Sequence, residues 1–195
     1  MAVPSIKGTA YNSVHDDLHK MIDEGRVTPE ELEARLTKEE LELFEGKVLA
    51  TKWYPIEMYR KMLALIAEHE SAGRVEEYLV ERGWRAADRL NQAGIYKQLL
   101  GPDDGRGKSW GARVENLVTK ISGLLYNFTK WRVEDRDGEN GFTVHIEDAK
   151  DFCDECRYTA QGFVSFASTL MAGEPIKISG KRVTPDHIVY TIRRS

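Results

Sequence analysis

The spacing of apolar residues changes part-way along this chain of 195 residues. Up to residue 125, apolar side chains recur at intervals of three and four, which is the spacing of one face of an α-helix. Beyond it they alternate with polar residues, as in "FTVHIED", where Phe142, Val144 and Ile146 fall on one side. Alternation is typical of a β-strand with one buried face. The change therefore predicts a helical N-terminal half followed by a sheet.

Helix start and stop signals divide the first half. In "TPEELEARLTKEELELFEG", Thr28 is an N-cap residue, Pro29 follows it, and Glu31 completes a capping box. Gly46 is a natural stop, so we expect one helix between them. Further helices are predicted over 55–73, 74–100 and 109–127, with Gly83 and Gly94 as breaks in the second of these.

The second half contains two pairs of alternating segments with a helical pattern between them. A hairpin is predicted over 126–148 with its polar loop at 137–141, and a second antiparallel pair is predicted from "EPIKISG" and "HIVYTIRR". Residues 149–172 have helical spacing. The fold class predicted is α+β, with β-β-α-β-β order in an antiparallel sheet packed by helices. We expect residues 1–50 to form a helical arm and 51–195 an α+β ligand-binding-like domain.

Composition excludes several classes of protein. The net charge is −4, which gives no basic excess for nucleic acid. Apolar runs are too short to span a bilayer, and the N-terminus lacks the pattern of a secretory signal. Two cysteines do not form a disulfide framework, so we expect a reduced, cytoplasmic protein.

Both cysteines lie in the segment "DFCDECRYTAQGF" at 151–163. Cys153 and Cys156 supply two of the four ligands that zinc needs, so His145, His187 or acidic groups would have to complete the shell. A redox pair needs a stabilised thiolate, which the neighbouring acidic residues disfavour. The third interpretation, which we favour, is that both pack as small apolar side chains.

No catalytic constellation stands out. The sequence contains no G-x-S-x-G elbow and no Gly-rich dinucleotide fingerprint, so nothing names an acid, base or nucleophile. His15 and His19 have a metal-compatible spacing, but a solvated polar face is the better interpretation. Trp53 and Tyr54 are fixed by Pro55 and either line a pocket or act as a hydrophobic staple. An enzyme that acts on a hydrophobic substrate stays an alternative, although the sequence does not identify its catalytic residues.

The segment "CRYTAQGFVSFASTLMAGEPIKIS", followed by the strand "HIVYTIRR", resembles the C-terminal half of 4-vinyl reductase-type domains. These share a superfamily with haem nitric-oxide-binding domains and trafficking-particle subunits. The matching positions are Cys156, Gly162, Phe163, Gly173, Glu174 and Pro175. "IKGTAYNSV" and "WYPIEMYRKML" are also similar to motifs of an uncharacterised bacterial family of about this length.

The resemblance implies a non-catalytic sensor or interaction domain in signalling. It would bind a small hydrophobic ligand or a protein partner, and a homodimer is favoured. A pocket would lie between sheet and helices, surrounded by Trp53, Tyr54, Trp131, Cys156 and Phe163. The alternative is a zinc-dependent regulatory module using Cys153 and Cys156, with His145 as a further ligand. The closing hairpin lacks the cysteines of zinc-binding relatives, and no Tyr-x-Ser-x-Arg motif is present. We therefore expect no cofactor, leave zinc open and consider haem unlikely.

Overall fold

The computed structural model describes residues 3–100, 109–135 and 140–195. The chain divides into two compact units, the first formed by residues 1–78 and 125–128 and the second by 79–124 and 129–195. The predicted boundary at residue 50 falls inside the first unit, and a separate arm over 1–50 stays a prediction. Within the described ranges, no helix is both long and apolar enough to cross a membrane.

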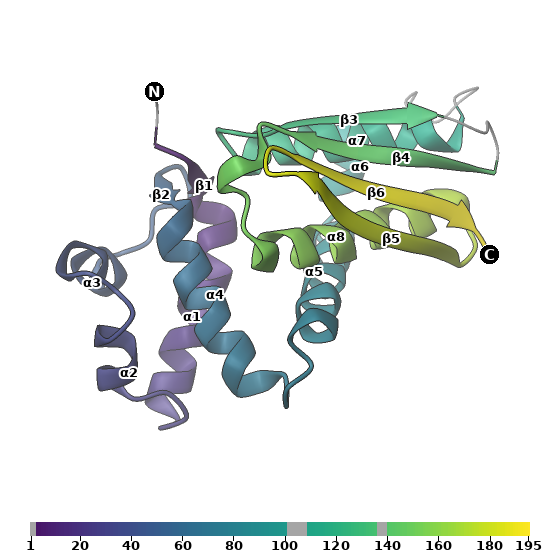
Figure 1. The fold of residues 1–195 in the computed structure, drawn as a ribbon. Coiled ribbons are helices and arrows are strands. Elements are labelled where there is room, and N and C mark those ends of the chain that lie inside the picture. Colours follow the sequence, from purple (N-terminus) through teal and green to yellow (C-terminus); the bar gives the residue numbers. More distant parts are fainter. Residues whose placement is uncertain (1–2, 101–108, 136–139) are drawn as a thin grey trace. The chain divides into compact units, whose positions relative to one another are not determined.

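The first unit is mainly helical (Figure 1). Its elements are β1 (Ser5–Lys7), α1 (Gly8–Asp23), α2 (Pro29–Glu33), α3 (Lys38–Glu45), β2 (Trp53–Pro55) and α4 (Ile56–Glu70). Strands β1 and β2 pair antiparallel, with Ile6 opposite Tyr54. Tyr54 is extended there, as expected for a residue before proline. The buried side chains of α1 and α4 include Tyr11, Val14, Leu18, Met58, Met62, Leu63, Leu65 and Ile66.

The segment 28–46 forms two helices rather than the single one expected. The Thr28 capping box is present, with Glu31 as its third helical residue. A second box follows, in which the Thr37 hydroxyl accepts from the Glu40 amide at 3.2 Å and the Glu40 carboxylate accepts from the Thr37 amide at 2.8 Å. Thr37 thus offers the backbone a new helix start, which competes with continuing the first helix.

The second unit is a four-stranded antiparallel sheet with helices. The strands are β3 (Lys130–Asp135), β4 (Gly141–Glu147), β5 (Ile176–Thr184) and β6 (His187–Arg194), in spatial order β3-β4-β6-β5. Helix α8 (Asp154–Ala172) joins β4 to β5 after the short 3-10 turn η1 (Ala149–Asp151). The predicted β-β-α-β-β order is confirmed. Residues 137–139 of the predicted hairpin loop lie outside the described residues.

One face of this sheet is apolar and packs against helices. Its buried residues are Phe142, Val144, Ile146, Ile188, Tyr190 and Ile192. Trp110, at the start of α7 (Trp110–Leu125), meets Phe142 edge to face at 4.8 Å between ring centroids. The Tyr190 hydroxyl donates to the carbonyl oxygen of Arg157 on α8 at 2.7 Å. Helices α7 and α8 therefore cover the same sheet face.

Helix α5 (Val75–Gln92) continues through Gly83, where a break was expected. A Cβ on Gly83 would lie 1.9 Å from the Thr159 carbonyl oxygen, and one on Gly162 would lie 1.9 Å from the Val80 carbonyl oxygen. The two glycines let the α5 and α8 backbones touch, so Gly83 serves packing rather than termination. Gly94, with φ +76°, ends the helical run before α6 (Ile95–Leu100).

Candidate functional site

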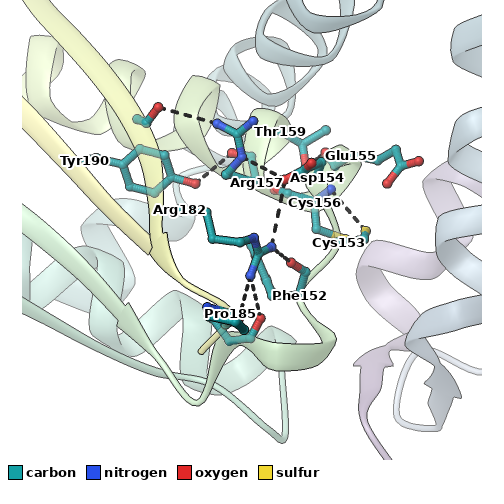
Figure 2. Close-up of polar contacts among 12 residues, drawn as sticks. Phe152, Cys153, Asp154, Glu155, Cys156, Arg157, Thr159, Arg182, Pro185 and Tyr190 are labelled. Atoms are coloured by element: carbon teal, nitrogen blue, oxygen red, sulfur yellow. Dashed lines mark hydrogen bonds and ion pairs between the residues drawn. The ribbon is translucent and has the colours of Figure 1, made fainter. Parts of the chain in front are cut away.

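The two cysteines lie at the N-terminal end of α8 (Figure 2). Cys153 is the N-cap residue, and its Sγ accepts from the Cys156 amide at 3.3 Å. Cys156 is fully buried in the core, and neither cysteine forms a disulfide. The sulfur of Cys153 thereby takes the place of the oxygen that normally caps a helix.

Arg182, on β5, connects this helix end to the β5–β6 hairpin (Figure 2). Its guanidinium donates to the carbonyl oxygens of Ala149 at 3.0 Å, Pro185 at 2.8 Å and Phe152. The Asp154 carboxylate lies 3.9 Å from the same guanidinium. A planar group with several fixed donors suits three converging carbonyls, so Arg182 has a structural role here.

Two more contacts hold the first turns of α8 to the sheet. Arg157 donates through Nε to Asp154 at 3.0 Å and through a terminal nitrogen to the Gly180 carbonyl at 3.4 Å. Burial raises the pKa of Tyr190 well above its ordinary range, so its hydroxyl stays protonated and donates to Arg157. This end of α8 is a hydrogen-bonded junction between helix and sheet.

His145, offered above as a zinc ligand, lies on the sheet face opposite the apolar one. It is 4% exposed. Its Nε2 lies 2.9 Å from Thr143 Oγ1 and 3.2 Å from Glu134 Oε2, and its Nδ1 lies 2.9 Å from His187 Nε2. Among the described residues, no three or more His, Cys, Asp or Glu side chains are grouped to hold a metal ion. The zinc set of Cys153, Cys156 and His145 stays a prediction.

The five residues predicted around a pocket belong to two units. In the first, Tyr54 is buried and stacks on Tyr11 with 4.1 Å between ring centroids, while Trp53 is 36% exposed beneath the Lys7 ammonium. In the second, Trp131 meets Phe152 edge to face at 6.2 Å, and Phe163 meets Tyr96 at 6.3 Å.

An aromatic cluster in the second unit was missed from the sequence. It consists of Trp84, Tyr96, Phe163 and Phe166, with Tyr96 6.2 Å from Phe166 and Trp84 5.1 Å from Phe166. Tyr96 is 2% exposed, and its hydroxyl has no hydrogen-bond partner among the described residues. Burial, with Asp88 as a smaller cause, raises the pKa of Tyr96 above its ordinary range. The three-residue spacing of Phe163 and Phe166 on a helix was the available signal.

The chain is similar to solved structures over almost its whole length. An H-NOX protein from K. algicida, in the unliganded Fe(II) form, aligns with TM-score 0.64 and 10% identity over 97% of this chain and 96% of that one. The chain has the H-NOX fold. An H-NOX protein from S. oneidensis in the Fe(II)NO state aligns with TM-score 0.61 and 13% identity, over 97% and 99% of the two chains. No family model matches the sequence, and no curated protein matches it.

The match to the H-NOX fold corrects the prediction about haem and confirms part of the family resemblance. A third structure of this fold, with TM-score 0.54, 12% identity and coverage of 96% and 99%, comes from work on haem redox potential and porphyrin distortion. The prediction that haem is unlikely is therefore wrong: a missing short motif does not exclude a cofactor associated with the fold. The haem nitric-oxide-binding part of the resemblance is confirmed for the fold, whereas the other family names stay predictions.

Proposed function

We propose that this chain is a non-catalytic sensor domain that binds a small ligand and passes the signal to a protein partner. The observation that carries the proposal is the H-NOX fold, matched over 97% of the chain. The fold neighbours include proteins described in iron and nitric oxide ligation states. Self-association as a homodimer and a cytoplasmic location stay predictions, the former checked by analytical ultracentrifugation.

Haem is the cofactor that the fold suggests, and the chain contains histidines of the type that bind haem iron. Haem iron takes imidazole as an axial ligand, and ligating histidines have their other ring nitrogen anchored by a hydrogen bond. His19, His69 and His187 each have Nε2 in a described contact, with His15, Glu31 and His145 respectively. A histidine of this set that bound the iron would do so through Nδ1. When bound, haem supplies an iron that coordinates a diatomic gas.

Reconstitution with hemin tests the cofactor. We expect one hemin per chain, with an intense Soret band that shifts when nitric oxide is added to the reduced protein. Alanine variants of His19, His69 and His187, made one at a time, should identify the ligand through loss of that band in one of them. A spectrum equal to free hemin in buffer would overturn the haem proposal.

A second candidate ligand is a small apolar molecule with one hydrogen-bonding atom. The aromatic cluster of Trp84, Tyr96, Phe163 and Phe166 supports it, because no residue in the described part of the chain bonds to the buried Tyr96 hydroxyl. An unpaired buried hydroxyl costs about 1–3 kcal/mol, and a ligand that pairs with it would remove that cost. Phe163 connects this cluster with the pocket predicted above.

Native mass spectrometry of the purified chain, compared with Tyr96→Phe, tests this candidate. We expect a retained small molecule in the wild type and an affinity about 5-fold lower in the variant, since a neutral hydrogen bond contributes about 1 kcal/mol. The ligand-free variant should be at least as stable as the wild type. Equal ligand retention by both proteins would count against the Tyr96 hydroxyl as a ligand contact.

A further inference from the structure

His15 and His19 lie one turn apart on α1 and meet at their ring nitrogens. The two Nε2 atoms are 3.2 Å apart, and His15 Nε2 lies 2.8 Å from the Phe44 carbonyl oxygen. The His19 ring stacks on the Phe44 ring at 4.2 Å, with 10° between planes. The His15 side chain is only 12% exposed. The sequence pattern favoured a solvated polar face here, whereas these rings are packed.

His15 has a polar contact at each ring nitrogen. Asp16 Oδ1 lies 3.4 Å from His15 Nδ1, and Asn12 donates to the other oxygen of that carboxylate. In the tautomer protonated at Nε2, His15 donates to the Phe44 carbonyl oxygen. A metal ion that replaces this proton would leave Nδ1–H to donate to Asp16. The lone pairs of His15 Nε2, His19 Nε2 and the Phe44 oxygen would then all be ligands to one ion.

The end of α3 also favours a cation. Phe44 lies in the last turn of this helix, where carbonyl groups lack intrahelical partners and the helix dipole is negative. No basic residue occupies that last turn. The Phe44 carbonyl therefore presents partial negative charge to the two imidazoles.

We propose that His15 Nε2, His19 Nε2 and the Phe44 carbonyl oxygen bind a divalent transition-metal ion of the class that prefers imidazole, such as copper(II) or nickel(II). Two neighbouring nitrogens on one square-planar ion at about 2.0–2.1 Å lie about 2.8–3.0 Å apart. The two Nε2 atoms are 3.2 Å apart, so the rings need to approach by only a few tenths of an ångström. Asp16 is the outer partner that orients His15. Solvent completes the coordination shell. The site lies within the first unit and requires no porphyrin.

Copper(II) titration of the haem-free full chain tests the site, by calorimetry and electron paramagnetic resonance. We expect one ion per chain with hyperfine splitting from two nitrogens. His15→Gln and His19→Ala should each weaken binding by about 100-fold or more and remove the two-nitrogen signature. Asp16→Asn should weaken it about 10-fold, as for other outer partners. His69→Ala and His187→Ala are the matched controls and should bind as the wild type does.

Two results would overturn the proposal. One is wild-type copper affinity and nitrogen hyperfine splitting in folded His19→Ala; the other is loss of the ion in either control. Circular dichroism of each variant checks that the fold is kept. If His19→Ala does not fold, His19→Gln replaces it, because the amide keeps a polar group against His15.

Discussion

At the residue scale, the Arg182 side chain holds the start of α8 to the β5–β6 hairpin. It donates to the carbonyls of Ala149, Phe152 and Pro185. Arg182→Lys keeps the charge but loses the planar fork, so we expect a loss of about 1–3 kcal/mol in the free energy of unfolding. Urea denaturation followed by circular dichroism measures it. The exposed neighbour Lys181 gives the control: Lys181→Ala should change stability by less than about 0.5 kcal/mol. Equal effects would contradict the structural role of Arg182.

Glu147 and Arg132, paired across β3 and β4, give a pH-dependent prediction. The hydrogen bond from Arg132 is the main cause that holds the pKa of Glu147 below its ordinary range. A lowered carboxyl pKa contributes stability above the unfolded value of about 4.3, and this is lost as pH falls through the folded value. Since the Glu147 side chain is 43% exposed, we expect less than about 1 kcal/mol. In Arg132→Gln, an NMR titration should show the pKa of Glu147 rising toward the ordinary value. An unchanged titration would exclude Arg132 as the cause.

The placement of His145 shows what sequence can predict about one residue. Alternation along β4 correctly assigned it to the face opposite Phe142 and Val144. Its burial could not be predicted, because its neighbours come from other strands: Glu134 on β3 and His187 on β6. Strand order is a long-range property that local spacing does not contain.

At the element scale, the crossing of α5 and α8 depends on two glycines. In Gly162→Ala the new methyl group would collide with the Val80 carbonyl, so the helices must separate and lose packing. We expect a cost of about 3 kcal/mol or more, in the range of severe core changes. The control is Gly123→Ala in α7, where no atom lies within 4 Å of the new Cβ. That change should stabilise the chain by up to about 1 kcal/mol, because alanine favours helix. Thermal unfolding of both variants decides: similar melting temperatures would refute the close crossing.

The starts of helices could be predicted where a capping box was recognised in the sequence. Thr28 with Glu31 gave the start of α2 correctly. The same signature at Thr37 and Glu40 starts α3. It was missed because Leu32, Leu36 and Leu43 also fall near one stripe of a single helix, which favoured one helix over two. The predicted helix break at Gly83 was wrong, because a glycine that permits close packing cannot be told from one that ends a helix. Local sequence does not tell these roles apart.

At the scale of the whole molecule, the change of apolar period was enough to predict the α+β class and the β-β-α-β-β order. The change of apolar period did not predict that β4 pairs with β6 rather than with β5. The cofactor prediction failed for a related reason, since it depended on one short motif. The fold is matched with 10% identity, so the arrangement of elements is similar where few individual residues are.

The haem proposal makes a prediction about the stability of the whole chain. A ligand that binds only the folded state at 100 times its Kd adds about 2.7 kcal/mol to stability. For a chain of this size that is a rise of about 5–10 °C in melting temperature. Hemin should produce it, whereas iron-free protoporphyrin IX offers the same apolar surface without the bond to histidine and should produce less. Equal shifts would mean that porphyrin binds without iron ligation, and no shift with either would remove haem from the proposal. Differential scanning calorimetry, with the histidine variant that lost the Soret band as control, separates these outcomes: its hemin shift should fall to that of the iron-free porphyrin.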